Sequence, residues 1–214
     1  GPLPPGARVS SSSAARSGTT GPARIGPNSI IRVAEALRAQ HGEATTARIF
    51  TAAGLTPYLE QLPDSMVLED EVIRLHAALR ADLSPDDAHA VSWEAGLRTG
   101  DYLLAHRIPQ PAQRVLKVMP AGLAARTLLQ AIGKHAWTFA GSGRFSAVPA
   151  HPVRITIENC PTARAGASDR PVCGFYSATF ERIFSTLVSP RARVSEIACA
   201  ATGAPACVFE VRWR

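Results

Sequence analysis

The sequence predicts an α+β fold in which a helical layer packs on an antiparallel sheet. Apolar residues recur at helical spacing through the first two thirds of the chain, whereas the last third alternates or runs in β-forming residues. A chain of 214 residues can bury a sizeable core as one domain. We therefore expect a single domain over residues 28–214, mainly helical over 28–136 and sheet-rich over 137–214.

The first 27 residues differ in composition from the rest of the chain. Gly1–Pro27 is rich in Gly, Pro, Ser and Ala and has few large apolar side chains. Such a segment cannot bury enough apolar surface to offset the entropy of ordering. We expect a disordered tail that lies outside the fold.

Six helices are expected before residue 137. The clearest start is Ser84-Pro85-Asp86-Asp87, where an N-cap serine precedes proline at the first position and two acids in the first turn. Gly54 is a plausible C-cap, and Pro109 should end the helix that Ser84 begins. The expected helices begin at residue 28 and span 43–53, 65–83, 84–108, 110–119 and 122–135.

The last third should form the sheet. Strands are expected over 137–148 and 153–159, and a helix over 173–187. A closing hairpin should join 193–201 to 206–214 around the turn at Thr202–Pro205, with Cys199 nearly opposite Cys207. On the last strand, one face should carry the residues Cys207, Phe209, Val211 and Trp213.

The net charge of +6 does not indicate nucleic-acid binding. Basic residues lie in the N-terminal tail and at the C-terminus, the remainder is mixed with acids, and no dense basic stripe is interleaved with aromatics. A basic surface would still attract anionic small molecules or an acidic partner protein. No stretch approaches the roughly 20 apolar residues of a membrane span. We expect a cytoplasmic protein that reaches membranes only through its partners.

Four cysteines, Cys160, Cys173, Cys199 and Cys207, lie in the last quarter of the chain. A reducing cytosol disfavours structural disulfides. The intervals of 12, 25 and 7 residues between them do not match the close C-x2-C pairs of zinc fingers. Either they form a metal site assembled from separate elements, or they are small buried core residues.

Several segments resemble a known family. The run from Val153 to Val211 contains Glu158-Asn159-Cys160-Pro161, Pro171-Val172-Cys173-Gly174-Phe175 and the Cys199–Cys207 turn, and it resembles the 4-vinyl reductase domain. The segments Trp93–Tyr102 and Gly133–Gly143 look like the bacteriochlorophyll-synthesis members of that family, the 4-vinyl (8-vinyl) reductase J proteins. The similarity extends over most of the chain from about Asn28.

The resemblance implies a metal and a ligand. Sensory relatives in the superfamily hold zinc with cysteines, at positions similar to Cys173, Cys199 and Cys207, and enclose an apolar ligand cavity. Cys160 is the first candidate for a fourth ligand and Glu181 the second. A closed four-ligand site would be structural. The resemblance also implies a homodimer.

The family name implies reduction of a vinyl group, which requires a redox cofactor. The sequence has no Rossmann fingerprint in a strand-turn-helix unit, and Gly141-Ser142-Gly143 is more typical of a strand bend or hairpin turn. The cysteine intervals match no compact iron–sulfur run. Three readings follow: a protein that binds and delivers a magnesium tetrapyrrole such as a magnesium porphyrin or chlorophyllide, the vinyl reductase itself, and a sensory or interaction module. The first two leave room for docking by neighbouring pathway enzymes.

A tetrapyrrole needs an apolar pocket, an axial ligand for its magnesium and cations for its carboxylates. Each candidate also has a plain structural reading, as a core aromatic, a helix-terminal histidine or a solvated arginine. The candidate wall residues are Trp93, Tyr102, Trp137, Phe139 and Phe145, the candidate axial ligands are His106 and His135, and the candidate carboxylate partners are Arg98 and Arg126.

Overall fold

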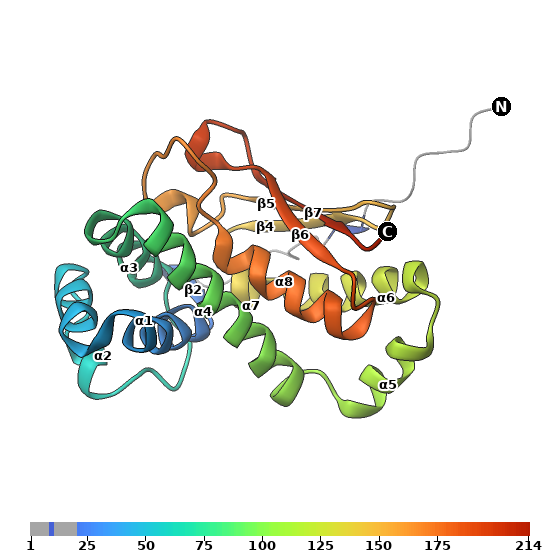
Figure 1. Ribbon diagram of the computed structural model, residues 1–214, viewed down its shortest axis with the longest axis horizontal. Coiled ribbons are helices and arrows are strands. Elements are labelled where there is room, and N and C mark those ends of the chain that lie inside the picture. The colour runs from blue at the N-terminus through green and yellow to red at the C-terminus, as the bar shows by residue number, and fades with distance from the viewer. Residues whose placement is uncertain (1–8, 11–20) are drawn as a thin grey trace.

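The computed structural model describes residues 9–10 and 21–214. Helices pack on an antiparallel sheet, so the predicted α+β class is confirmed (Figure 1). The longer strands lie in the last third of the chain, as the change in apolar pattern predicts.

The main sheet has the order β1-β4-β5-β7-β6, with every neighbouring pair antiparallel. The closing hairpin is confirmed in shorter form, with an irregularity in register between Glu196 and Ala198. The apolar side chains at alternate positions of β7 face the core, as the period of two requires. The strands are β1 (Val9–Ser10), β4 (Arg144–Val148), β5 (Val153–Glu158), β6 (Arg193–Ala198) and β7 (Cys207–Arg212).

The helices follow the predicted order. The expected first and second helices are one element, α1, bent at Gly42 (φ 79°), a conformation that glycine adopts readily. Ser84 caps α4 as predicted, because its side chain accepts a hydrogen bond from Asp87 N at 3.2 Å. The helices are α1 (Asn28–Ala52), α2 (Pro57–Glu60), α3 (Glu69–Asp82), α4 (Pro85–His106), α5 (Gln110–Val118), α6 (Ala121–Lys134), α7 (Trp137–Ala140) and α8 (Gly174–Leu187).

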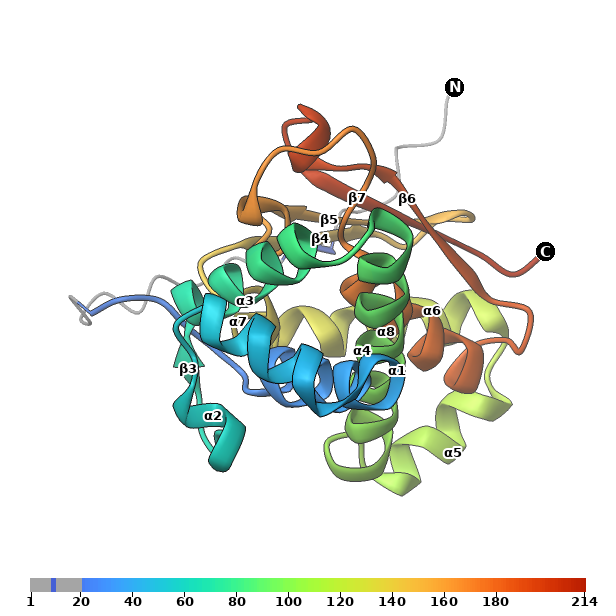
Figure 2. The ribbon, with the colours of Figure 1, turned by 60° about the vertical axis from the view of Figure 1, so that its left-hand side comes forward.

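The central helix pair is α4 and α8, which cross at close range (Figure 2). A Cβ on Gly96 would lie 2.7 Å from the Cβ of Ala178, and one on Gly100 would lie 2.7 Å from the Cβ of Arg182. Thr179 Oγ1 donates to the Gly96 carbonyl oxygen at 3.0 Å. The glycines of the Trp93–Tyr102 segment therefore let two helix backbones approach.

The folded region begins earlier than expected. Arg24–Ile25 forms β2, which pairs with β3 (Val67–Leu68), and Ile25 is only 1% exposed. Gly26 N donates to the Thr138 carbonyl oxygen at 2.6 Å. Of the predicted tail, residues 1–8 and 11–20 lie outside the described residues, and the boundary at residue 27 is too late because Ile25 contributes to the core.

The expected strand over 137–148 is wrong in its first half. Trp137–Ala140 is the short helix α7, because the chain continues helically from the end of α6, with Thr138 Oγ1 donating to the His135 carbonyl oxygen at 2.7 Å. Gly141-Ser142-Gly143 is accordingly a helix-to-strand turn rather than a hairpin. Gly141 has φ 58°, and Ser142 N donates to the buried carboxylate of Glu69 at 3.0 Å.

Within the described part of the chain, no helix is both long enough and apolar enough to cross a membrane.

Candidate functional site

The four cysteines converge at one end of the sheet. Cys160 follows β5, Cys173 precedes the first turn of α8, Cys199 follows β6, and Cys207 begins β7. The pairing of Ala198 with Val208 brings Cys199 close to Cys207, as predicted. All four side chains are 0% exposed, so the cluster is closed to solvent.

Cys173 is the centre of the cluster. Its Sγ lies 3.6 Å from that of Cys207, 3.8 Å from that of Cys160 and 4.0 Å from that of Cys199. Thr162 Oγ1 donates to Cys173 Sγ at 3.1 Å, and Ala200 N donates to Cys207 Sγ at 3.4 Å. The structure therefore brings together all four cysteines that the sequence indicated.

Glu196 is a member of the cluster that the sequence analysis missed. Its carboxylate and the sulfurs of Cys173, Cys199 and Cys207 all lie within 4.8 Å of one another. One carboxylate oxygen accepts from Cys173 N at 2.9 Å, whereas Oε1 is buried and has no hydrogen-bond partner among the described residues. The only signal in the sequence was an acid three residues before Cys199 on a strand, which is weak because strands often carry outward-facing acids.

Burial shifts the protonation equilibria of this cluster. Burial, with the neighbouring Cys199 thiol, raises the pKa of Glu196 to about 8. Hydrogen bonds to Cys160, Cys199 and Cys207 raise the pKa of the Cys173 thiol well above its usual value. Packing so many acidic groups without a counter-charge is unfavourable, and a bound cation would reverse both shifts.

The donor set fits a zinc ion. Tetrahedral Zn²⁺ with Zn–S bonds of about 2.3 Å separates its sulfur ligands by about 3.8 Å. The Sγ–Sγ distances from Cys173 span that value, and the unpaired Glu196 Oε1 is an oxygen donor without a partner in the described chain. Thiolates with one carboxylate suit Zn²⁺ better than magnesium or calcium, which prefer oxygen ligands.

Glu181, the second candidate for a fourth ligand, lies outside this set. Its Oε1 accepts a hydrogen bond from Val194 N at 3.1 Å and so fixes the start of β6 against α8. Cys160 contacts Cys173 but is not part of the group within 4.8 Å. The cluster thus has four mutually close donors and a fifth thiol beside them.

The candidate tetrapyrrole residues do not form one site. Phe139 and Phe145 belong to an aromatic group with Tyr176, Phe180 and Phe209. This group packs between α8 and the sheet, where Phe145 and Phe209 are fully buried. The two predicted wall residues are therefore core residues here, because their rings pack edge-to-face against each other and their neighbours.

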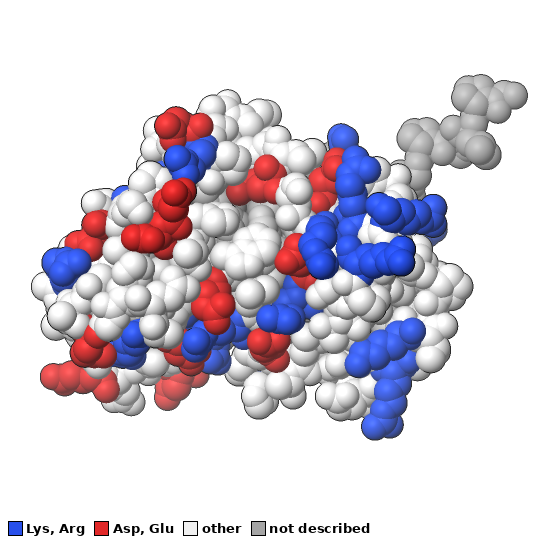
Figure 3. Space-filling view, viewed as in Figure 1, with Lys and Arg blue, Asp and Glu red and all other residues white. Residues whose placement is uncertain are grey.

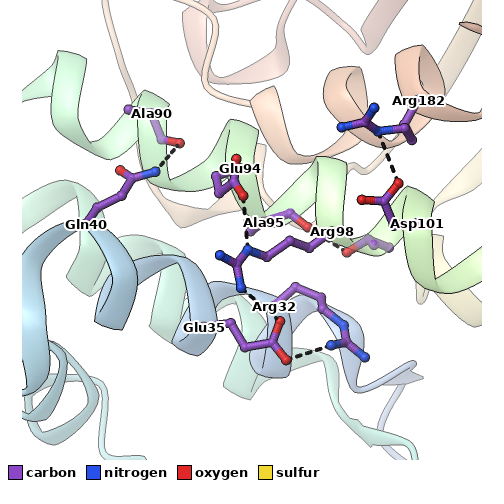
Figure 4. Close-up of polar contacts among 10 residues, drawn as sticks. Arg32, Glu35, Gln40, Ala90, Glu94, Ala95, Arg98, Asp101 and Arg182 are labelled. Carbon is purple, nitrogen blue, oxygen red and sulfur yellow. Dashed lines mark hydrogen bonds and ion pairs between the residues drawn. The ribbon is translucent and has the colours of Figure 1, made fainter.

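Arg98 and Tyr102 have partners on the helical layer. Arg98 Nε pairs with Glu94 at 3.0 Å, and its Nη1 lies 3.5 Å from a Glu35 carboxylate oxygen (Figure 4). The guanidinium carbon of Arg32 lies 4.9 Å from the centre of the Tyr102 ring, which also contacts His106. Arg98 is thus engaged with carboxylates of its own chain.

The remaining candidates are dispersed. His106, Arg126, His135 and Trp137 are all exposed, at the end of α4, on α6, just after it and on α7. Trp137 is 60% exposed, although alternation with Phe139 had suggested a core strand. The helical period of α7 explains this difference, because residues two apart on a helix do not share a face.

A pocket of about 480 Å³ lies between the end of α3, the start of α4 and the loop over 165–172. Its polar side chains include Arg80, His89, Ser92 and Arg170, and its apolar lining includes Ala77, Ala88 and Val172. The predicted wall residue Trp93 is adjacent, since its ring centre lies 5.9 Å from that of His89. Pockets of this size accommodate small ligands.

Arg80 provides the unusual feature of this pocket. Its Nη2 donates to the Gly166 carbonyl oxygen at 2.7 Å, but its Nη1 is buried without a hydrogen-bond partner among the described residues. Arg170 is half-exposed and pairs with Asp86 at 3.0 Å. The pocket therefore offers guanidinium donors for an anionic group, beside an imidazole that could coordinate a metal.

Comparison with known proteins gave a domain family and two close relatives. Residues 153–213 match the model of the 4-vinyl reductase domain. The chain is 47% identical to the bacteriochlorophyll synthase 23 kDa chain of Cereibacter sphaeroides, over 90% of this chain and 94% of that protein. It is 43% identical to the protein of the same name from Rhodobacter capsulatus, over 87% and 85% of the two chains. A solved H-NOX protein from S. oneidensis matches 89% of this chain and 99% of its own with a TM-score of 0.48 and 12% identity.

Proposed function

The chain belongs to the family of bacteriochlorophyll synthase 23 kDa chains, which carry the 4-vinyl reductase domain, and on that premise we propose that it binds and delivers a magnesium tetrapyrrole intermediate. Its role lies in bacteriochlorophyll biosynthesis. Precursors of this pigment carry carboxylates on a large apolar ring, so a carrier needs cationic donors beside apolar surface.

The observation that carries this proposal is the pocket beside α4. The unpaired Arg80 Nη1 would donate to a carboxylate, and Arg170 at the rim would add a second cation. His89 would supply an axial nitrogen to the magnesium, and Trp93 an aromatic face for the ring. At about 480 Å³, the pocket would hold the carboxylate-bearing edge of the macrocycle and leave the rest accessible to a receiving enzyme.

We also propose that the cysteine cluster holds a structural zinc ion through Cys173, Glu196, Cys199 and Cys207. When bound, zinc would supply a fixed cross-link and a positive charge. The ligands come from β6, β7 and the start of α8, so the ion would fix the helix against the sheet. The loop over 165–172, which lines the pocket, ends next to Cys173 and would be held by the same ion.

The carrier proposal is tested by titrating the protein with magnesium protoporphyrin while following the Soret band and tryptophan quenching. We expect saturable binding, weakened about tenfold or more in His89→Ala and Arg170→Gln, because each removes one polar contact with the ligand. The matched controls are His135→Ala and Arg126→Gln, which remove the same groups from exposed positions on α6 and just after it.

Equal weakening by the controls, or no saturable shift, would contradict the pocket as the binding site. Adding NADPH to the complex with a divinyl intermediate separates the second candidate function. Conversion to the monovinyl spectrum would establish the vinyl reductase and overturn a purely carrying role.

The zinc proposal is tested by the metal content of the purified protein. We expect about one zinc per chain, its loss in Cys199→Ser and Cys207→Ser, and its retention in Cys160→Ser. Loss in Cys160→Ser together with retention in Glu196→Gln would instead assign the fourth ligand to Cys160.

A further inference from the structure

One long part of the chain contains no acidic residue. Between Asp101 and Glu158 the sequence has no Asp or Glu, but it has seven Lys or Arg. The sequence analysis had expected the basic residues of the folded region to be mixed with acids, and this stretch corrects that expectation. Its cations are Arg107, Arg114, Lys117, Arg126, Lys134, Arg144 and Arg154.

The same stretch contains most of the exposed apolar surface. Among the large apolar residues that are exposed in the described chain, Val115, Val118, Leu123 and Trp137 lie within it and Ile197 lies outside it. Val118 is 83% exposed, Val115 53% and Leu123 50%. Three of these residues lie on α5 and the first turn of α6.

Helix α5 is fixed to the protein by one face only. Gln113 is buried, and its side-chain amide donates to the carbonyl oxygens of Leu104 and Ile108 at 2.6 and 2.8 Å. Leu116, one turn later, is buried on the same face. The outward face therefore carries the two exposed valines together with Arg114 and Lys117.

Helix α6 continues this surface. Leu123 and Arg126 are one turn apart and both are exposed, and α5 and α6 contact each other along the fold. We call Arg114, Val115, Lys117, Val118, Leu123 and Arg126 the α5–α6 patch. In the view of Figure 3 the region over α5 shows basic side chains and no acidic ones, whereas acidic side chains gather toward the α1 and α2 end.

The composition of the patch favours a lipid surface over a protein partner. Protein interfaces are enriched in aromatic residues and depleted in lysine, and Val and Leu are uncommon among their main binding residues. Aliphatic side chains surrounded by Arg and Lys are instead typical of helices that lie in the interface of an anionic bilayer. The absence of acids in the stretch removes the repulsion that would oppose such docking.

We propose that the α5–α6 patch docks the protein on the surface of an anionic lipid bilayer. The aliphatic side chains enter the headgroup boundary, and the three cations pair with lipid phosphates. This inference does not depend on tetrapyrrole binding, since the pocket beside α4 is formed by other residues.

The test is flotation of the full chain with vesicles of phosphatidylglycerol and phosphatidylcholine, compared with vesicles of phosphatidylcholine alone. We expect flotation with the anionic vesicles only, and a loss of binding as salt rises. The triple variants Val115→Ser/Val118→Ser/Leu123→Ser and Arg114→Gln/Lys117→Gln/Arg126→Gln should each reduce partitioning at least about tenfold. The matched controls, Ile197→Ser and Arg38→Gln/Arg48→Gln, should bind as the parent does.

No flotation with anionic vesicles, or equal effects of the patch and control variants, would overturn the proposal. If the parent chain fails to float but cross-links to an acidic protein that both triple variants lose, the patch belongs to a protein interface and the lipid proposal is wrong. Circular dichroism of the triple variants establishes that α5 and α6 remain folded, so lost flotation then reports docking.

Discussion

Buried polar atoms without partners identify the sites in this protein at the scale of single residues. Native proteins rarely leave such atoms unpaired. Among the described residues, Glu196 Oε1 lies in the cysteine cluster and Arg80 Nη1 beside the α4 pocket, where each has a proposed ligand. His76 Nε2 is also unpaired, but it lies in the core against Phe175 and near Arg80, where no ligand is proposed.

His76 should make the protein sensitive to acid. Burial, with a smaller contribution from Arg80, lowers the pKa of His76 to about 4. Between pH 6.5 and 4 the unfolded chain therefore binds a proton that the folded chain does not, and the free energy of unfolding falls as the pH falls. Relative to His76→Leu, the parent should lose about 2 kcal/mol more between about pH 7 and about pH 4.5.

Urea unfolding at the two pH values measures this difference, and the other histidines cancel in the comparison. The leucine variant also removes an unpaired polar atom, so at neutral pH it should be no less stable than the parent beyond about 1 kcal/mol. Parallel pH dependence in the two proteins would show that His76 is not the group responsible.

At the scale of elements, the α4–α8 crossing determines how the helical layer meets the sheet. Gly96 and Gly100 are four residues apart, so both lie on the face of α4 that contacts α8. The family-like segment Trp93–Tyr102 thus has a packing role in this structure, and its charged residue Arg98 faces Glu35 of α1 (Figure 4).

Gly96→Ala should lower the free energy of unfolding by about 1–3 kcal/mol. Its Cβ would overlap the Phe175 carbonyl oxygen and lie 2.7 Å from the Cβ of Ala178, so the two helices would have to separate. The matched control is Gly122→Ala, because a Cβ there meets no atom within 4 Å. Alanine is the better helix former, so the control should be neutral or stabilising by up to about 1 kcal/mol. Chemical unfolding of both variants checks the prediction, and equal losses would contradict the close-packing explanation.

At the scale of the whole molecule, the cysteine cluster connects the sheet to α8. Cys160 follows β5, Cys207 begins β7, and Cys173 adjoins α8, so the elements that bury the aromatic core meet there. A metal bound only by the folded chain adds its binding free energy to stability.

Removal of the proposed zinc should therefore lower the thermal midpoint and expose the thiols. We expect the four cysteines to resist a thiol reagent in the intact protein, because all are 0% exposed, and to react after chelation. Differential scanning calorimetry and thiol titration, with and without a chelator, measure the two effects. Zinc added back should restore both properties. A midpoint that does not change on chelation would mean that the cluster is stable without metal.

The sequence by itself determined the fold class, most helices, the closing hairpin and the convergence of the cysteines. These follow from local patterns: the cap at Ser84, the alternation on β7, and the turn that brings Cys199 beside Cys207. Tertiary structure decided the rest, because contacts between distant segments override local pattern. Trp137 and Phe139 alternate as in a strand, yet they lie on α7; Ile25, inside a Gly- and Pro-rich segment, is buried by pairing with β3. Glu196 joined the cysteines, and Arg80 met the loop over 165–172, through juxtapositions that no spacing along the chain encodes.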